Sequence, residues 1–257
     1  PRDLKGVTSF GHIEDDAASG LSTYLRPKGV VAAIVPSTNP LATPVNNMIN
    51  ALKTGNAIIL APSPKGVKPL QTLLGHILPA LRRVGVPDNL VQMVPVPPSK
   101  PKTERLMQLA DMVLVTGSQA NVRAGYSSGT PAIGVGAGNV VTIVDETADI
   151  DAAAARIAAS KIFDNATSCS SENAVVVVDA VRERLLEAMA REGGMLLDDA
   201  QTAALEAMHW HGGKLTPRLL AKDIDIVLAG TGLADTAPDG TRFLIAPQTA
   251  IGAGHPM

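Results

Sequence analysis

The stretch GVVAAIVPSTNPLATPVNNMINALKTGNAIIL, residues 29–60, holds the pattern that predicts the fold. An apolar run of strand length at residues 30–35 is followed by a polar loop, a helical segment and a second apolar run at residues 57–60. Thr43 is placed to cap the helix, Pro44 suits its first position, and Gly55 suits its end. Both runs are apolar throughout, which is typical of parallel strands covered on both faces. The stretch therefore predicts a strand–helix–strand unit.

The same alternation of apolar runs and helix-period segments continues along the chain. Ser118 is placed to cap one later helix, and Asp149 and Asp151 lie at the positive end of another. Gly75 and Pro79 are expected to weaken or shorten the helix that contains them. This order of elements predicts an α/β protein with a doubly wound parallel sheet. The other predicted strands are residues 90–94, 112–116, 140–144, 174–178 and 242–246, and the other predicted helices are residues 67–83, 118–124, 150–162, 181–192 and 198–208.

Two segments fall outside this alternation. Residues 13–24 are polar and interrupted by glycine, and a turn at residues 26–29 leads from them into the first buried strand. We expect an edge hairpin or an arm there. Residues 95–101 are polar and rich in proline, which predicts an exposed loop.

The composition excludes several classes of function. The chain has 257 residues, of which 46% are hydrophobic, so it can bury one large core or two modest ones. Its 22 Lys and Arg against 24 Asp and Glu give a net charge of −2, and only 2% of its residues are aromatic. Neither value suits a nucleic-acid surface. The apolar runs are far shorter than the roughly 20 residues of a membrane span, so we expect neither nucleic acid nor membrane as a partner.

The ends and the cysteine content suggest where the protein works. No secretory leader is visible at residues 1–3, and the single cysteine, Cys169, cannot form an internal disulfide. A reducing, cytoplasmic location is therefore expected. The chain does not begin with methionine, and we expect it to be part of a longer protein.

Cys169 is the first candidate for chemistry. It lies in the polar segment FDNATSCSSEN, residues 163–173, between a predicted Ala-rich helix and a predicted apolar strand. A loop held by rigid elements is a suitable place for a nucleophile. An inert, partly buried cysteine is the alternative and is the commoner state of a lone cysteine. The polar neighbours, such as Asn165 and Thr167, weaken that alternative.

Three further segments follow strands and could bind a ligand. Asn39 comes after the first buried strand and could donate from its amide into the crevice at the strand ends, or it could be an ordinary turn asparagine. Gly117 and Ser118 could bind a pyrophosphate at a helix start, or Ser118 could simply cap the helix; there is no Gly-x-Gly-x-x-Gly fingerprint. The glycine-rich residues 131–139 allow close approach of a ligand, or form a flexible connector.

Other polar clusters are weak signals. His209 and His211 lack a nearby cysteine or carboxylate pair, so no metal site is predicted there. Lys65 and Lys68 are most simply the exposed side of a helix, although either could approach an adenosine phosphate.

Five separated strings resemble, in order and in approximate spacing, the aldehyde dehydrogenase superfamily and, more narrowly, its coenzyme A-acylating branch. The resemblance covers nearly the whole chain. Within the branch, residues 164–173 and 252–256 are similar to the members that act on sulfoacetaldehyde. It implies an NAD(P)-binding domain at residues 1–133, with an oligomerisation hairpin at 13–28, and a catalytic α/β domain at 134–257, both incomplete at their outer ends. The five strings are residues 35–40, 53–64, 116–118, 134–139 and 163–172.

The resemblance assigns roles to individual residues. It makes Cys169 the nucleophile, and it places the Asn39 amide and the Cys169 backbone N–H in an oxyanion hole. Hydrolytic members carry a lysine at the position of Ala61. The residues implied in cofactor binding are Pro36, Ser37 and Thr38 in the cleft, Ala61, Pro62 and Ser63 at the adenosine ribose, Gly117 and Ser118 at the pyrophosphate, and Val135 and Gly136 beside the nicotinamide.

The sequence departs from the hydrolytic pattern at Gly134, where hydrolytic members have a general-base glutamate. Without a base to activate water, a thioester on Cys169 would await a stronger nucleophile, the thiol of coenzyme A. The resemblance thus implies oxidation of a small aldehyde by NAD+ or NADP+, through a thiohemiacetal and a thioester on Cys169, to an acyl-CoA. Glu172, three residues after the cysteine, is interpreted as a structural residue of the loop, with a catalytic role as the alternative.

Several alternatives stay open. The aldehyde could be sulfoacetaldehyde, acetaldehyde, propionaldehyde or succinate semialdehyde, and the choice between NAD and NADP is not fixed. An acyl-phosphate reductase of the same superfamily would use the same cysteine without coenzyme A. Family members continue beyond the segment matched here, so an inactive fragment, or one with impaired activity, is the third possibility. The resemblance also implies a homodimer or homotetramer.

Overall fold

The computed structural model describes residues 2–136, 138, 140–211, 214–216, 218–219, 221–248, 250 and 252. The chain divides into two compact units, Pro1–Ala137 and Gly138–Met257, and each is described by itself. Parts of two strings that carried the resemblance, at residues 137, 139 and 253–256, lie outside the described residues. None of the helices described here is long and apolar enough to cross a membrane.

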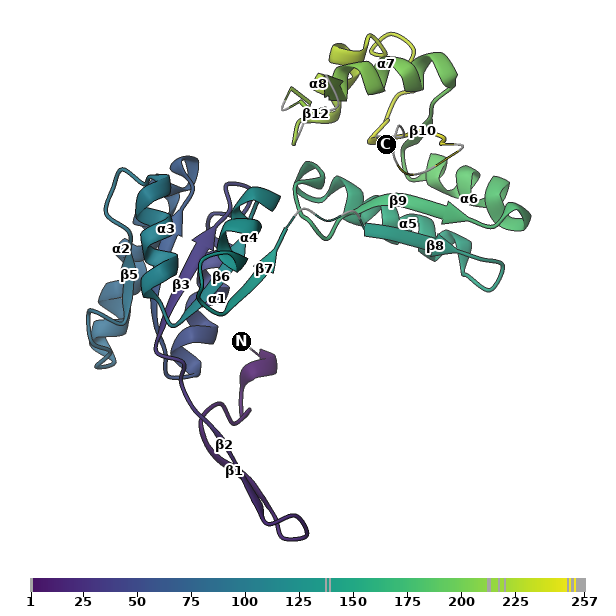
Figure 1. Cartoon of the computed structure of the whole chain (residues 1–257). Helices are drawn as coiled ribbons and strands as arrows, with labels where there is room; N and C mark the ends of the chain where they lie inside the picture. Colours follow the sequence, from purple (N-terminus) through teal and green to yellow (C-terminus); the bar gives the residue numbers. More distant parts are fainter. Residues whose placement is uncertain are drawn as a thin grey trace. The chain divides into compact units, whose positions relative to one another are not determined.

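The first unit is built around a five-stranded sheet in the order β5-β4-β3-β6-β7, with every neighbouring pair parallel (Figure 1). The chain runs outward from β3 through β4 to β5 and then returns to the other side of β3 for β6 and β7. This is the doubly wound order that the sequence predicted. The elements are η1 (Arg2–Leu4), β1 (Gly11–Asp16), β2 (Leu21–Leu25), β3 (Val30–Val35), α1 (Ala42–Lys53), β4 (Ala57–Pro62), η2 (Pro64–Gly66), α2 (Val67–Arg83), β5 (Val91–Met93), α3 (Lys100–Leu109), β6 (Met112–Thr116), α4 (Gln119–Tyr126) and β7 (Ala132–Val135).

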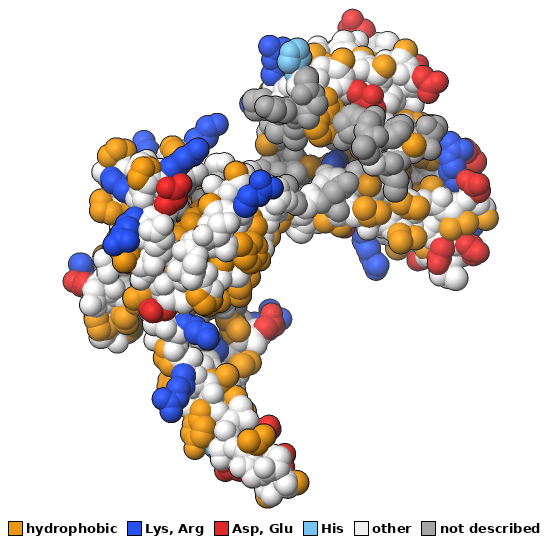
Figure 2. All heavy atoms as spheres, viewed as in Figure 1, with side chains coloured by type: hydrophobic (Ala, Val, Ile, Leu, Met, Phe, Trp, Pro, Cys, Tyr) orange, Lys and Arg blue, Asp and Glu red, His pale blue; other side chains and the backbone are white. Residues whose placement is uncertain are grey.

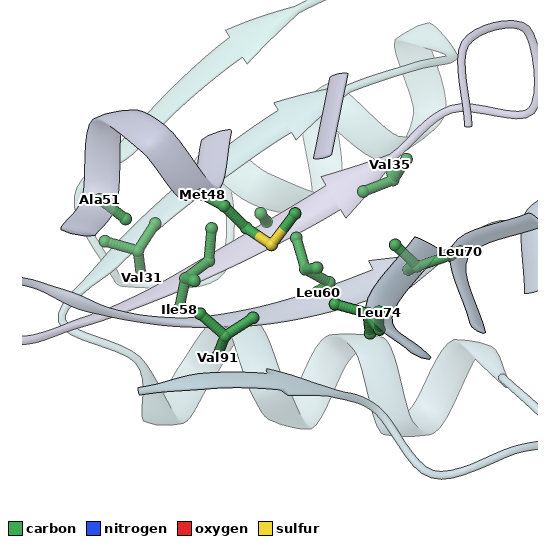
Figure 3. Close-up of a cluster of buried hydrophobic side chains, with 10 residues drawn as sticks. Val31, Val35, Met48, Ala51, Ile58, Leu60, Leu70, Leu74 and Val91 are labelled. Carbon is green, nitrogen blue, oxygen red and sulfur yellow. The ribbon is translucent and has the colours of Figure 1, made fainter. Parts of the chain in front are cut away.

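The central strand β3 is buried on both faces, which explains its uninterrupted apolar run. Val31, Ala33 and Val35 pack with α1 and α2 in one cluster (Figure 3). Ala32 and Ile34 belong to a second cluster that includes Met107 of α3 and has Val122 and Ala124 of α4 packed against it. Side chains alternate along a strand, so a strand covered by helices on both sides needs apolar residues at every position.

Two predictions about helices of the first unit were wrong. Thr43 does not cap α1, which begins at Ala42 with Leu41 in the N-cap position. The helix α2 was expected to be weakened or shortened, but it runs without a break through Pro79. Packing of its buried stripe against the sheet outweighs the local cost of the proline, and the carbonyl that loses its partner belongs to Gly75, four residues earlier.

The sequence analysis missed the short strands at residues 194–196, 210–211 and 214–215, and three longer elements. The predicted loop at residues 95–101 ends in the start of α3, where Ser99 accepts a hydrogen bond from the Lys102 N–H. The glycine-rich segment contains β7, which pairs with β6, so Gly134 and Val135 belong to the sheet of the first unit. The third is helix α8 (Ile224–Thr231) of the second unit.

The expected arm is present as the antiparallel hairpin β1–β2, which extends away from the sheet (Figure 1). All of its residues are exposed, and Figure 2 shows hydrophobic side chains along it. The link from the hairpin to β3 is fixed by Asn56, the residue before β4, whose Oδ1 accepts from the N–H groups of Lys28 and Gly29. Gly29 has a φ of +122°, and a Cβ there would lie 2.2 Å from Asp111 Oδ2, so only glycine fits.

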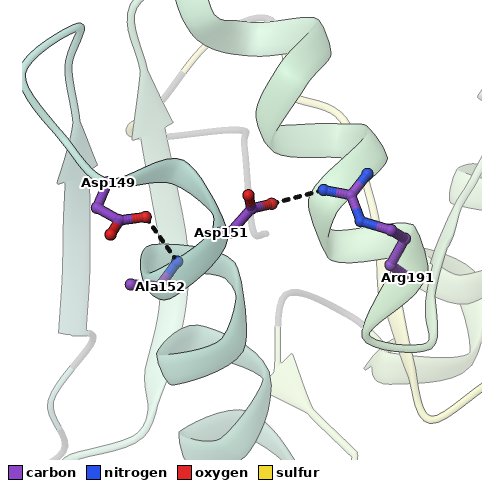
Figure 4. A network of polar contacts seen from close by, with 4 residues as sticks. All are labelled: Asp149, Asp151, Ala152 and Arg191. Atoms are coloured by element: carbon purple, nitrogen blue, oxygen red, sulfur yellow. Dashed lines mark hydrogen bonds and ion pairs between the residues drawn. The ribbon is translucent and has the colours of Figure 1, made fainter.

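The second unit places two helices against the parallel pair β8–β9, and a further parallel pair is formed by β10 and β13. Helices α5 and α6 share one core with Val144 and Phe243. Asp149 caps α5, and Arg191 of α6 contacts Asp151 at 2.6 Å (Figure 4). The elements are β8 (Val140–Val144), α5 (Ile150–Ile162), η3 (Phe163–Ala166), β9 (Glu172–Val177), α6 (Asp179–Arg191), β10 (Gly194–Leu196), α7 (Asp199–His209), β11 (Trp210–His211), β12 (Lys214–Leu215), α8 (Ile224–Thr231) and β13 (Phe243–Ile245).

Candidate active site

The strands of the first unit end at one level, and this gathers the residues expected to bind a cofactor. The register pairs Val35 of β3 with Pro62 of β4, and Thr116 of β6 with Val135 of β7. The last carbonyls of β3 and β7 accept hydrogen bonds from the residues that follow the neighbouring strands: the Ser63 N–H donates to Val35 O, and the Gly117 N–H donates to Val135 O. The segments at residues 36–39, 61–63, 117–118 and 135–136 therefore lie along the same carboxyl edge of the sheet.

This edge includes the point where the strand order reverses. The chain leaves β3 toward α1 on one face and leaves β6 toward α4 on the other. In open parallel sheets, ligands bind in the crevice that forms outside such a switch point. Pro36, Ser37 and Thr38 follow one of these strands, and Gly117 and Ser118 follow the other.

A hollow of about 470 Å³ opens beside α1, over the face of β6 and β7 that α4 does not cover. Asn39 and Val135 both line it, so the structure brings these two predicted residues to one surface. The Nδ2 atom of Asn47, also in the lining, is buried and has no hydrogen-bond partner among the described residues. The remaining lining residues are Ala42, Thr43, Asn46, Asn50, Leu114, Val115, Thr116 and Ile133.

The amide of Asn39 has a fixed orientation. Its Oδ1 accepts a hydrogen bond of 3.0 Å from the Ala42 N–H at the start of α1. A backbone N–H can only donate, so the amide oxygen must face it, and the Nδ2 hydrogens are left for a ligand. The turn role and the donor role, which were alternatives in the sequence, are thus compatible in one side chain.

The other predicted contact residues differ in what they expose. Ser118 caps α4 by accepting from the Asn121 N–H, and Gly117 lies beside it at the helix start. Ala61 and Pro62 are buried, and the Ala61 side chain belongs to the core. Ser63 is half-buried and accepts from the Gly66 N–H. Of the segment 61–63, only Ser63 presents a polar side chain at the edge.

Gly134 is enclosed on the side where a side chain would point. A Cβ at this position would lie 2.6 Å from Val122 Cγ1 and 3.0 Å from the ring of Tyr126. The Gly134 N–H also donates to the Tyr126 hydroxyl. The strand position at which the resemblance placed the base of hydrolytic members therefore holds no carboxylate here, and α4 leaves no room for one.

In the second unit, Cys169 is exposed in the loop between η3 and β9. The turn before it is strained, since Asp164, Asn165 and Ala166 have φ values of 50°, 50° and 56°. A left-handed conformation costs roughly 1–2 kcal/mol per residue with a Cβ, and Asn and Asp tolerate it better than Ala does. Three such residues in succession need support from their surroundings.

Hydrogen bonds within the loop provide part of that support. Thr167 returns to the carbonyl of Asp164 through both its N–H and its hydroxyl, at 3.0 and 2.6 Å. The hydroxyls of Ser168 and Ser170 lie 2.8 Å apart, one on each side of Cys169. Ser171 is 2% exposed and donates from its N–H to the carbonyl of Ser168. The cysteine is therefore exposed on a loop whose neighbours are tied down.

A pair of charged residues lies at the two ends of this loop. Lys161, in the last turn of α5, donates to Asn173 Oδ1 at 2.9 Å and so joins the helix to the start of β9. Burial lowers the pKa of Lys161, and the nearby Glu172 carboxylate acts in the opposite direction. The Glu172 Oε2 atom is buried and accepts no hydrogen bond from the described residues. These contacts link the elements that flank the cysteine loop.

Within the described ranges, no group of three or more His, Cys, Asp or Glu side chains could hold a metal ion. His209 instead places Nδ1 3.1 Å from the Leu205 carbonyl at the end of α7.

The asparagines of α1 that line the hollow were missed in the sequence. Their spacing along one helix, at 46, 47 and 50, was the available signal.

Comparison with known proteins decides the family. The model of the aldehyde dehydrogenase family matches residues 4–199, well over half of the chain. This chain belongs to the aldehyde dehydrogenase family. The match begins before the hairpin and extends past the Cys169 loop, so it includes every residue for which a site role was predicted.

Two of the most similar relatives are named as acylating enzymes. The chain is 50% identical over 256 residues to the sulfoacetaldehyde dehydrogenase (acylating) of Cupriavidus necator, covering 100% of this chain and 52% of that protein. It is 42% identical over 248 residues to the enzyme of the same name from Bilophila wadsworthia, covering 95% and 53%. The chain thus spans about half the length of these relatives.

Solved structures agree with the fold. A probable aldehyde dehydrogenase from Listeria monocytogenes superposes with a TM-score of 0.93 at 33% identity, over 99% of this chain and 56% of that one. A propionaldehyde dehydrogenase from Rhodopseudomonas palustris, solved with bound propionyl-CoA, gives 0.79 at 30% identity over 86% and 49%. An engineered glycolyl-CoA reductase with bound NADP+ gives 0.79 at 31% identity over 86% and 50%.

Proposed function

We propose that the protein oxidises a small aldehyde with NAD+ or NADP+ and coenzyme A, and releases an acyl-CoA. The observation that carries this proposal is Gly134, enclosed by Val122 and Tyr126, in a chain of the family whose only cysteine is exposed. An enzyme that traps an acyl group on sulfur and lacks a base for water needs another acceptor, and the thiol of coenzyme A is a strong nucleophile for a thioester. The similarity to acylating sulfoacetaldehyde dehydrogenases makes sulfoacetaldehyde the first substrate to test.

The carboxyl edge of the first unit fits a dinucleotide. Gly117 and Ser118 lead into α4, whose positive N-terminal end suits a pyrophosphate, and the Nδ2 of Asn47, buried and without a hydrogen-bond partner among the described residues, adds a donor within the neighbouring hollow. Val135 supplies an exposed apolar surface in the same hollow. The residues proposed to hold the cofactor are Pro36, Ser37, Thr38, Ser63, Gly117, Ser118, Val135 and Gly136, with Ala61 and Pro62 contributing backbone.

The chain's own residues then have distinct tasks. The Cys169 thiolate attacks the aldehyde carbon and forms a C–S bond, while the carbonyl oxygen takes the negative charge. We assign stabilisation of this oxyanion to the Asn39 Nδ2 and the Cys169 N–H. A bound nicotinamide supplies the hydride acceptor. After loss of hydride the acyl group remains on sulfur as a thioester. The thiolate of coenzyme A attacks that carbon, and Cys169 leaves as thiolate.

The proposal is tested by following both products in one reaction. The protein is mixed with sulfoacetaldehyde, acetaldehyde, propionaldehyde or succinate semialdehyde, with NAD+ or NADP+, and with or without coenzyme A. Mass spectrometry should detect the acyl-CoA, and cofactor reduction should depend on coenzyme A. Equal reduction without coenzyme A, with free acid as the product, would refute the proposal. Turnover that needs phosphate instead would favour an acyl-phosphate reductase.

We also propose that the protein is a homodimer or homotetramer of the cytoplasm and that the β1–β2 hairpin is part of its contact. An isolated two-stranded hairpin is marginally stable in water, yet Leu21 and Tyr24 remain 66% and 56% exposed on it. The single cysteine favours a reducing compartment. Leu21→Asp should shift the sedimentation coefficient to that of a smaller species, whereas the exposed control Val84→Asp, on the sheet domain, should leave it unchanged.

A further inference from the structure

Asp223 immediately precedes α8, yet its side chain does not cap that helix. An aspartate in the N-cap position ordinarily accepts a hydrogen bond from the first turn. Within this described helix that bond is absent, and the carboxylate Oδ1 instead accepts from Asn165 Nδ2 at 2.8 Å. A carboxylate can only accept, so the amide nitrogen must face it. The two residues are 58 positions apart, and a tertiary contact has replaced the local one.

Asn165 is the middle residue of the left-handed turn that precedes Cys169. Its neighbours Asp164 and Ala166 share the same positive φ. Between described residues, Asn165–Asp223 is the one side-chain hydrogen bond that ties this turn to an element outside residues 160–173. An unfavourable backbone conformation persists only where its surroundings determine it. The bond to Asp223 is therefore placed to hold the strained turn from outside.

We propose that Asp223 is a positioning residue for Cys169, because its hydrogen bond to Asn165 holds the left-handed turn that aims the cysteine loop. This inference rests on the proposed function of Cys169 as nucleophile. Asp223 itself does not touch the reacting atoms. It acts through Asn165, which lies in the turn whose Asp164 carbonyl accepts the Thr167 bonds. In this way it fixes the position of the segment that carries the sulfur.

The chain offers matched variants for this proposal. Asp223→Ala removes the acceptor, and because the carboxylate does not cap α8, the helix loses no side-chain hydrogen bond. Asp223→Asn keeps an oxygen that can accept from Asn165. Asp225, exposed in the first turn of α8, provides the control Asp225→Ala, which removes a carboxylate near the same helix end. Asn165→Asp removes the donor and keeps a residue type that tolerates the left-handed region.

The first measurement is amide hydrogen exchange in the full 257-residue chain, and it does not depend on catalysis. The N–H groups of Thr167 and Ser171, which are bonded within the loop, report on its closure. We expect Asp223→Ala and Asn165→Asp to speed their exchange about tenfold, the effect of losing one hydrogen bond. The double variant should be no faster than the faster single variant. Asp223→Asn and Asp225→Ala should stay within about twofold of the parent protein.

The second measurement is formation of the acyl-CoA. Asp223→Ala should lower kcat about 10- to 100-fold with little change in KM for cofactor and coenzyme A, because a misplaced nucleophile slows the chemical step. Asp223→Asn should restore the rate. Equal exchange in Asp223→Ala and Asp225→Ala, or failure of Asp223→Asn to rescue, would overturn the proposal. If the parent protein forms no thioester but shows the expected exchange pattern, the proposed function fails while the anchoring of the loop stands.

Discussion

The loops that follow the strands of the first unit and the loop that carries Cys169 are held in different ways. The former are fixed by sheet register, since the carbonyls of Val35 and Val135 bond the first N–H groups beyond β4 and β6. The latter leaves a helix end through three left-handed residues and is held by side-chain hydrogen bonds. Strand pairing alone therefore positions the edge of the sheet proposed to bind the cofactor, whereas the loop that carries Cys169 needs side-chain hydrogen bonds of its own.

The largest expected effect comes from removing the reactive atom of the second loop. Cys169→Ser should lower the rate of acyl-CoA formation by about 10⁴-fold or more, because an alcohol is a far poorer nucleophile than a thiolate. Circular dichroism should be unchanged, since the side chain is exposed. Retention of a tenth of the parent activity would show that another group carries the acyl chain.

The next effect tests the donor at the sheet edge. Asn39→Asp keeps the oxygen that accepts from the Ala42 N–H but removes the Nδ2 donor. The rate should fall about 10²- to 10³-fold, as for loss of one oxyanion donor, while thermal stability is retained. Asn39→Ala should lose the same activity and, in addition, about 1 kcal/mol of stability with the lost cap-like bond. Equal activity of Asn39→Asp and the parent would remove Asn39 from the mechanism.

A smaller effect measures the strain stored before the cysteine. Ala166→Gly should raise the free energy of unfolding by about 0.5–1 kcal/mol, because relief of the left-handed penalty exceeds the added entropy of the unfolded chain. The matched control is Ala159→Gly, at an exposed site within α5, which should lower it by about 1 kcal/mol. Urea unfolding checks both values. The same sign for the two substitutions would show that the turn is not strained.

The smallest effect is the pH dependence at the base of the cysteine loop. Burial lowers the pKa of Lys161 below 10.5, so between its folded and unfolded values the unfolded chain binds more protons. Its contribution to stability therefore rises with pH in that window and is least favourable below the folded pKa. The difference in unfolding free energy between the parent and Lys161→Met should thus increase from about pH 7 to pH 10. Lys65→Met, at an exposed lysine, is the control.

Much of the fold was predicted because its signals are local. The apolar runs of β3, β6 and β8 and the helical stripe of α5 have in the structure the boundaries expected from the sequence. Ser118 caps its helix as predicted, and Asp149, which was expected only at the positive end of α5, also caps it. The errors have a physical pattern as well. The interruption expected at Pro79 was overruled by packing, and β7 was missed because a four-residue strand with a glycine has no periodicity of its own.

The sequence by itself determined the βαβ order, the buried parallel sheet and the choice of Cys169 and Asn39 as candidates. Each depends on residues close together in the chain, where hydrophobic period and capping act directly. Only the tertiary structure decided that the Asn39 oxygen faces the Ala42 N–H, that α4 closes the space at Gly134, and that Asp223 bonds Asn165. The last two depend on contacts between separate elements, which no local pattern encodes. The first is a local contact, but it depends on the rotation of the Asn39 side chain, which the sequence left open.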